Sequence, residues 1–170
     1  LGPEMKSTGE VMGTGRTFGE AYMKAQNATG ITIPQSGSVF ISVRDPDKTV
    51  NLLRLAEFLI RKEFEIIATD GTNRFLNDNN IQSSHINKVH EGKPHIVALI
   101  RKELIDLIIN TTEGKQSIEE SLSIRAEAVI RNVTYYTSLE AAVATMNSFD
   151  YFNIMNVTKI QDYYKVEVHR

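Results

Sequence analysis

Short apolar runs alternate along the chain with longer segments in which apolar residues recur at helical spacing. The runs are rich in β-branched residues, which is typical of buried strands, and they occupy 38–43, 64–69, 83–89, 104–110 and 133–137. Between and around them, helical spacing predicts helices at 17–26, 47–62, 73–79, 96–102, 117–132 and 138–148. Strands that alternate with helices indicate a parallel sheet covered on both faces. We therefore expect an α/β fold, a three-layer α/β/α domain with a mostly parallel five-stranded sheet.

The domain is expected to begin after a polar stretch near residue 30. Gly30, Pro34 and Gly37 interrupt this stretch, so residues 31–36 are the best candidate for a linker. The chain is thereby divided into a segment at 1–30 and an α/β domain at 37–170. Near the end of the chain, an alternating run at 163–168 predicts an additional edge strand.

Composition and charge narrow the classes of function. The 170 residues are 41% hydrophobic and 24% charged, a profile typical of a globular protein. Basic side chains number 19 and acidic ones 21, for a net charge of −2, so neither nucleic acid nor a membrane is expected as a partner. No apolar run approaches the roughly 20 residues that span a bilayer. The first residues lack a secretory signal pattern, and we expect a cytoplasmic protein.

Hydroxyl, amide and ammonium groups follow four of the predicted strands, where each strand ends. In chain order they are Ser42 and Lys48, Thr69 and Thr72, Lys88, and Asn110, Thr111 and Thr112. The carboxyl ends of parallel strands meet at one edge of the sheet, where open α/β folds bind ligands. Hydroxyl and backbone donors beside lysines are what a phosphate monoester requires, and the Asn110 amide can read a sugar or base edge. The sequence thus predicts a small anionic ligand at this edge.

Each of these signals, taken alone, also has a purely structural interpretation. Thr72 is in a position typical of a helix cap, and single lysines such as Lys48 and Lys88 are usually solvated. The Asp70–Gly71 pair is common in plain turns. The convergence of four strand ends on one edge of one sheet favours the ligand site over these separate explanations.

No catalytic residue and no metal site are predicted. His90 and His95 are five positions apart, which does not place both on one helix face, and no carboxylate cluster accompanies them. Cysteine is absent, and no serine lies in a recognisable nucleophile elbow. Acidic residues near the expected site could act as acid or base, or form ion pairs with neighbouring lysines; they are Asp45, Asp47, Asp70 and Glu113.

Several motifs resemble the C-terminal region of the large subunit of the carbamoyl-phosphate synthases. They are TDGT at 69–72, INKVHEGKPHI at 86–96 and INTTEGKQSIEESLSIR at 109–125. That region has the methylglyoxal-synthase-like fold, and the resemblance covers nearly the whole chain. Segment 1–30 is similar to the end of the subunit's second ATP-grasp half and is expected to be a short remnant of that domain. The ATP site and its Mg²⁺ or Mn²⁺ would lie upstream, so no cofactor is expected in this chain.

The resemblance implies a regulatory function. In bacterial members of the family this region binds allosteric effectors: UMP inhibits, and IMP and ornithine activate. Carried over by motif, the effector phosphate would contact Lys48, Thr69, Thr72 and Lys88 with Ser42 close by, and the nucleoside would contact Asn110, Thr111 and Thr112. Thr137 matches the position of an ornithine-linked contact with the catalytic half.

The implied parent is an ATP-dependent ligase. It makes carbamoyl phosphate from glutamine-derived ammonia, bicarbonate and ATP, for pyrimidine and arginine synthesis. The implied partners are the catalytic ATP-grasp domains of the same chain, a glutaminase small subunit and, through an oligomer contact, further large subunits. The segment by itself would regulate and would not catalyse.

Two other interpretations fit the sequence less well. The glycine-rich stretch at 9–19 is not preceded by a predicted strand, so it lacks the context of a phosphate-binding loop. A stand-alone methylglyoxal-synthase-like lyase acting on dihydroxyacetone phosphate would need a carboxylate base beside the phosphate site. In those enzymes an Asp-Pro pair, and soon afterwards a Pro-His-Asp run, follow the fourth strand, whereas this chain has neither at 110–115.

Overall fold

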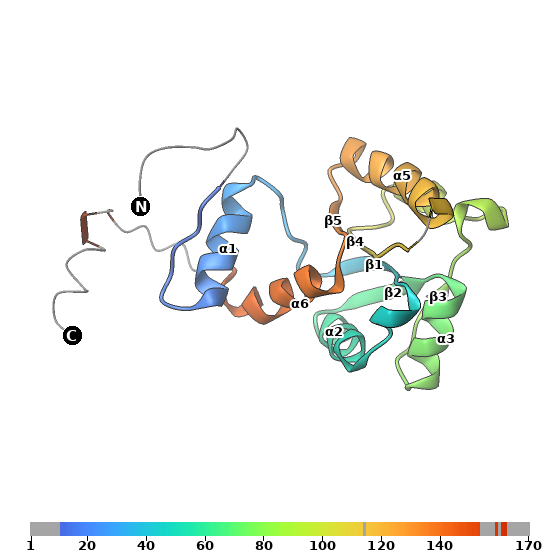
Figure 1. Cartoon of the computed structure of the whole chain (residues 1–170), viewed down its shortest axis with the longest axis horizontal. Coiled ribbons are helices and arrows are strands. Elements are labelled where there is room, and N and C mark those ends of the chain that lie inside the picture. Colours follow the sequence, from blue (N-terminus) through green and yellow to red (C-terminus); the bar gives the residue numbers. More distant parts are fainter. Residues whose placement is uncertain (1–10, 114, 154–158, 160, 163–170) are drawn as a thin grey trace.

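The computed structural model describes residues 11–113, 115–153, 159 and 161–162 (Figure 1). Its centre is a five-stranded sheet in the order β3-β2-β1-β4-β5. The strands are β1 (Gly37–Ser42), β2 (Phe64–Ala68), β3 (Ser84–His85), β4 (Leu107–Asn110) and β5 (Thr134–Tyr136). Every neighbouring pair runs parallel. The expected parallel five-stranded sheet is therefore confirmed.

In the described ranges of the chain, six α-helices connect and flank the strands. They are α1 (Phe18–Ala28), α2 (Val50–Arg61), α3 (Asp70–Asp78), α4 (Ile96–Arg101), α5 (Lys115–Ile130) and α6 (Leu139–Ser148). Three short 3₁₀ turns accompany them: η1 (Asp45–Asp47), η2 (Val89–Glu91) and η3 (Phe149–Tyr151). In the described part of the chain, none of the helices combines the length and the apolar character needed to cross a membrane.

Successive side chains of β1 belong to two apolar layers, one on each face of the sheet. Val39 and Ile41 lie in one core cluster with residues of α2, α3 and α6, whereas Phe40 lies in the other with residues of α4 and α5. Successive residues of a strand point to opposite faces of the sheet, so β1 contributes to both layers. All three side chains are fully buried, which confirms the expected three-layer α/β/α architecture.

Several predicted element boundaries differ from those observed. The strand expected at 83–89 is reduced to Ser84–His85, an edge strand whose two side chains are exposed and give it no buried face. The strand expected at 104–110 begins only at Leu107, because the backbone turns through a left-handed residue, Glu103, with φ 58°. Helix α3 begins at Asp70 rather than at residue 73. The edge strand expected at 163–168 lies outside the described residues.

The start of β1 is tied to the start of β4. The Asp106 carboxylate accepts a hydrogen bond from the Ser38 backbone N–H at 2.7 Å, and the Asp106 N–H donates to the Ser38 carbonyl at 2.9 Å. Gly37 adopts φ 121°, and a Cβ at this position would overlap the Asp106 carboxylate. Glycine is therefore required here both by the backbone angle and by the close approach of Asp106.

Helix α1 packs against the end of the sheet domain instead of lying apart from it. Figure 1 shows α1 beside α6, and Met23 of α1 is 1% exposed in an apolar cluster with Ile33 and Phe149. The Tyr22 hydroxyl lies 3.0 Å from the Thr145 hydroxyl of α6. The segment before the predicted linker is thus in direct contact with the domain that follows it.

Substitution of Ile41 by alanine tests the importance of the two-faced central strand. Ile41 is fully buried, and Ile→Ala substitutions in cores typically lower the free energy of unfolding by about 2–5 kcal/mol. Urea denaturation followed by circular dichroism measures the change. Ile130→Ala is the matched control, because Ile130 is 72% exposed; equal losses in the two variants would contradict the packing described above.

Candidate functional site

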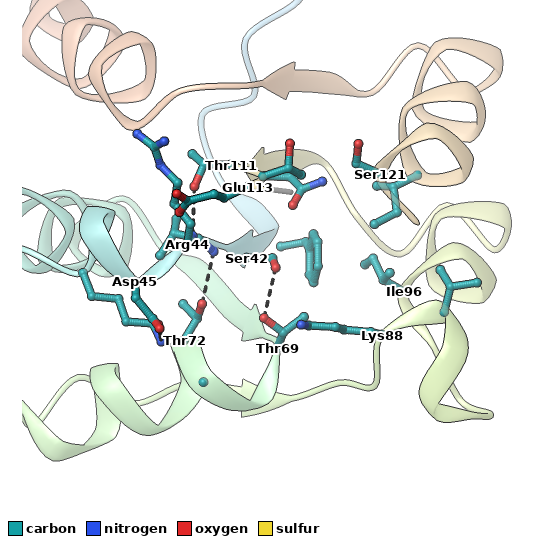
Figure 2. A pocket seen from close by; sticks show the side chains of 18 residues that line it. Ser42, Arg44, Asp45, Thr69, Thr72, Lys88, Ile96, Thr111, Glu113 and Ser121 are labelled. Carbon is teal, nitrogen blue, oxygen red and sulfur yellow. Dashed lines mark hydrogen bonds and ion pairs between the residues drawn. The ribbon is translucent and has the colours of Figure 1, made fainter. Parts of the chain in front are cut away.

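A cavity of about 420 Å³ opens at the carboxyl ends of β1, β2 and β4 (Figure 2). The chain passes from β1 to β2 and β3 on one side, then crosses back to β4 on the other side of β1. Such a reversal leaves a crevice at the carboxyl ends of the central strands, where doubly wound folds bind ligands. The cavity thus lies where the topology alone would place a site.

Eight of the nine residues singled out from the sequence line this cavity. They are Ser42, Lys48, Thr69, Thr72, Lys88, Asn110, Thr111 and Thr112. The ninth, Thr137, follows β5 and is not among the lining residues. The predicted convergence of strand ends is therefore present in the structure, while the binding of a ligand there stays a prediction.

The polar end of the cavity contains the first turn of α3. Thr69 occupies the N-cap position, but its hydroxyl donates to the Ser42 hydroxyl at 3.0 Å and does not cap the helix. The backbone N–H groups at the start of a helix carry a partial positive charge and need partners. Because the N-cap side chain is engaged elsewhere, these donors are available to an anion.

Thr72 is not the helix cap that its sequence position alone suggests. It lies inside the first turn of α3, is 1% exposed, and accepts a hydrogen bond from the Val43 backbone N–H at 3.1 Å. This contact joins α3 to the end of β1. The Thr72 hydroxyl proton is still available, because a hydroxyl both donates and accepts.

Two lysines reach the polar end from different elements. The ammonium of Lys48 lies 2.6 Å from the Asp45 carboxylate, and a Cβ at Gly71 would lie 3.0 Å from it. The missing side chain of Gly71 therefore lets Lys48 approach the start of α3. Lys88 points toward Thr69 from the opposite side in Figure 2, and no carboxylate of the described residues forms an ion pair with it.

Thr111 has a structural role beside its place in the cavity wall. Its hydroxyl accepts from the Arg44 backbone N–H at 3.0 Å and also hydrogen-bonds the Asp47 carboxylate. Asp47 is 8% exposed and receives the Arg44 guanidinium at 2.9 Å. Arg44 and, to a smaller extent, Thr111 hold the pKa of Asp47 below its usual value. This network fixes η1, the turn that carries Asp45 and leads to Lys48.

The other end of the cavity is apolar. Four side chains form it: Phe40 of β1, Val89 of η2, Ile96 of α4 and Ile124 of α5. The Asn110 amide lies beside this end and donates to the Tyr135 hydroxyl at 2.7 Å. Ser121 of α5 also lines the cavity.

Sequence reasoning did not select the four apolar side chains or Ser121 as site residues. Phe40 is read as one of many core positions in an apolar strand, and Ile124 and Ser121 lie well inside a helix. Two of these residues, Val89 and Ile96, could have been expected near the site from their positions in the sequence. Val89 directly follows Lys88, and Ile96 begins the helix after Pro94. Of the apolar residues that line the cavity, those at the starts of connecting helices could therefore have been predicted from the sequence.

No cluster suited to a metal ion is present in the part of the chain that the structure describes. His90 and His95 are not among the residues lining the cavity. Three of the four acidic residues considered as acid or base are ion-paired: Asp45 with Lys48, Asp47 with Arg44, and Asp70 with Arg74. The geometry suits the binding of an anion with an apolar portion better than proton transfer.

Part of the chain matches a known protein family. The profile of the MGS-like domain matches residues 51–137, which is more than half of the chain. The chain belongs to the MGS-like domain family. The matched residues begin in α2 and end just after β5, so they include α3, Lys88 and the Asn110–Thr112 stretch of the cavity wall.

Curated relatives of this MGS-like domain are called carbamoyl phosphate synthase large chain. A protein of that name from Xanthomonas campestris is 46% identical over 97% of this chain, and one from Xylella fastidiosa Temecula1 is 47% identical over 97%. A third, from Mesorhizobium japonicum, is 40% identical over 96%. The chain spans about 15% of the length of these relatives.

Substitution of Asp47 by asparagine tests the network that fixes η1. The variant loses hydrogen bonds to a charged group, each worth about 1.5–3 kcal/mol, so the free energy of unfolding at pH 7 should fall. A lowered folded-state pKa stabilises the protein above the unfolded pKa and loses that effect as the pH falls through the folded value. The difference between variant and wild type should therefore shrink as the pH falls below about 4.

Denaturant unfolding at a series of pH values measures this dependence. Asp78→Asn removes a carboxylate from an exposed position at the end of α3 and is the control. A difference for Asp47→Asn that stays constant between pH 7 and pH 3, or that Asp78→Asn reproduces, would contradict the assignment.

Proposed function

We propose that this chain is the regulatory region of a carbamoyl phosphate synthase large chain and that its cavity binds a nucleoside monophosphate effector, UMP or IMP. The observation that carries the proposal is the cavity itself. One end offers cationic and hydroxyl groups for a phosphate, and the other offers apolar side chains for a base. The names of relatives that are 40–47% identical over nearly the whole chain support the parent protein.

The phosphate is assigned to the start of α3. Backbone N–H groups of its first turn, the hydroxyls of Ser42, Thr69 and Thr72, and the ammonium groups of Lys48 and Lys88 converge there. Charge-assisted hydrogen bonds contribute about 1.5–3 kcal/mol each. Several such bonds, reduced by the desolvation of the lysines, suffice for micromolar binding, which corresponds to about 8 kcal/mol in all.

The nucleoside is assigned to the apolar end. Val89, Ile96 and Ile124 come from three different elements and can enclose the faces of a base, while Asn110 and Ser121 supply hydrogen-bonding groups at its edge. Thr112 also lines the cavity, where it can contact the sugar. The volume of about 420 Å³ falls within the usual range for small-molecule sites, about 300–1,000 Å³.

A relay from the cavity to α1 is proposed through β5. On one face of the sheet, Tyr135 accepts the hydrogen bond from Asn110. On the other face, the Tyr136 hydroxyl receives a hydrogen bond from Thr145 at 2.9 Å, and Thr145 contacts Tyr22 of α1. Burial raises the pKa of Tyr136 to about 12, so this hydroxyl stays protonated. An effector that shifts Asn110 would thus act on the contact between α1 and α6.

In the parent protein this relay would lead to the catalytic domains. Residues 1–30 are proposed as the end of the second ATP-grasp domain, 31–36 as the linker, and Thr137 as part of an ornithine-linked contact. The parent would act in the cytoplasm with a glutaminase small subunit, ATP and Mg²⁺ or Mn²⁺. The lyase alternative is not favoured, because the Asp-Pro pair and the Pro-His-Asp run that follow the fourth strand in those enzymes are absent at 110–115.

Isothermal titration calorimetry with UMP and IMP tests the site. Lys88→Met keeps the apolar stem but removes the charge, and it should weaken binding of the effector at least about tenfold, which is about 1.4 kcal/mol. The reason is that the Lys88 ammonium donates hydrogen bonds to the phosphate in this assignment, and no carboxylate of the described residues forms an ion pair with it.

Lys102→Met serves as the matched control, because Lys102 is exposed at the end of α4 and does not line the cavity. It should leave the affinity unchanged. If neither UMP nor IMP binds the folded wild-type chain, or if both variants bind like the wild type, the phosphate site is wrong.

Hydrogen–deuterium exchange tests the relay in the same chain. UMP should raise the protection of amides in α1, because binding at Asn110 stabilises the arrangement that β5, α6 and α1 share. Tyr136→Phe removes the hydroxyl that receives the Thr145 hydrogen bond, so it should reduce this distant protection while leaving UMP affinity within about twofold. Undiminished protection of α1 in the variant would exclude this route.

A further inference from the structure

Asp45 occupies an unusual place for a carboxylate. It lines the cavity at the polar end, next to the groups assigned to the phosphate. Its carboxylate lies 2.6 Å from the ammonium of Lys48, and its side chain is 90% exposed, whereas that of Lys48 is 19% exposed. The lysine ammonium is therefore largely enclosed, whereas the carboxylate that pairs with it stays open to solvent at the cavity wall.

The two ends of the cavity fix the direction in which a nucleotide would lie. With the base between Val89 and Ile96, the phosphate points toward the start of α3. A second phosphate, attached beyond the first, would have to extend further from the base. In Figure 2 Asp45 lies at the far side of Thr72 from Ile96, and this is the side toward which a second phosphate would extend.

The charges around the cavity suit one phosphate better than two. Among the described residues, three cations line it, Arg44, Lys48 and Lys88, together with two carboxylates, Asp45 and Glu113. The guanidinium of Arg44 is held by Asp47 and the ammonium of Lys48 by Asp45, so Lys88 is the lining cation without an ion pair among the described residues. A phosphate monoester carries about −1.5 to −2 at pH 7, which Lys88 and a Lys48 shared with Asp45 balance only in part. A diphosphate adds negative charge where the next protein group is itself anionic.

We propose that Asp45 makes this site selective for nucleoside monophosphates by repelling a second phosphate. The inference rests on the proposed function and adds to it the residue that limits the bound nucleotide to a single phosphate. Discrimination of this kind comes from a repulsive element placed against the wrong ligand, not only from contacts with the right one. The hydrogen bond from Lys48 lowers the pKa of Asp45, and Lys88 adds a smaller effect, so the carboxylate stays charged at neutral pH.

A surface ion pair without a role in binding is the competing explanation, and the chain contains a matched example. Asp70, in the first turn of α3, pairs with Arg74 at 2.9 Å and does not line the cavity. Both carboxylates lie near the start of the same helix. Asp45→Asn and Asp70→Asn therefore remove the same charge from the same region, but only the former changes the cavity wall.

Calorimetric titration of wild type and the two variants with UMP and with UDP is the test. In the wild type, UMP should bind more tightly than UDP. Asp45→Asn removes the repulsion and frees Lys48, so the ratio of the UDP to the UMP dissociation constant should fall about tenfold. Asp70→Asn should leave this ratio unchanged, and Asp45→Glu, which keeps the charge, should retain most of the wild-type preference.

The outcomes separate this inference from the proposed function. If UMP binds the wild type but Asp45→Asn leaves the ratio unchanged, or if Asp70→Asn lowers it equally, the selectivity role of Asp45 is wrong while the effector site stands. If UDP binds the wild type as tightly as UMP, the same conclusion follows. If UMP fails to bind the folded wild type at all, the effector site and the selectivity role are both wrong.

Discussion

The pairing of β1 with both β2 and β4 is the constraint on which the rest of the molecule depends. Because β1 is central, both of its faces are buried, and the connections on its two sides leave in opposite directions. This strand order leaves a crevice between those connections, and the crevice does not depend on which side chains line it. The residues that follow β1 and β4 are therefore brought together by backbone topology, and Ser42 and Asn110 are register partners at its edge.

Within that crevice, hydroxyl groups serve both the fold and the site. Thr111 is occupied on two sides by the η1 network, and Thr72 holds the backbone at the end of β1. Thr69 turns its hydroxyl to Ser42 and leaves the start of α3 without a side-chain cap. An uncapped helix start costs stability in the free protein. The same feature leaves backbone donors in place for a ligand, so some stability is given up where binding is proposed.

The sheet and most of the polar wall could be predicted from the sequence, because both depend on local patterns. Apolar runs with β-branched residues locate the strands, and the residue after each run falls at the sheet edge. The apolar wall could not be predicted this way. Ile124 and Phe40 look like ordinary core residues, and only the packing of α4 and α5 over β1 leaves a gap beside them.

The ion pairs could not be predicted from the sequence either. A string containing Asp45, Asp47 and Lys48 permits several pairings, and η1 selects one arrangement by placing Arg44 against Asp47 and Lys48 against Asp45. The third strand was predicted too long because SSHINKV contains β-branched residues, whereas only Ser84 and His85 pair with β2 and both of their side chains are exposed.

Gly37 has a consequence for how the molecule can bend. The next residue, Ser38, donates its backbone N–H to the Asp106 carboxylate, and the Thr134 hydroxyl donates to the Thr32 carbonyl at 2.8 Å, so the chain is fixed to the sheet on both sides of Pro34. Gly30 has open space around it and a left-handed backbone angle. A swivel between α1 and the sheet would therefore have its pivot at Thr29–Ile31, ahead of the clamp, and the sheet would turn as a rigid block from Thr32 onward.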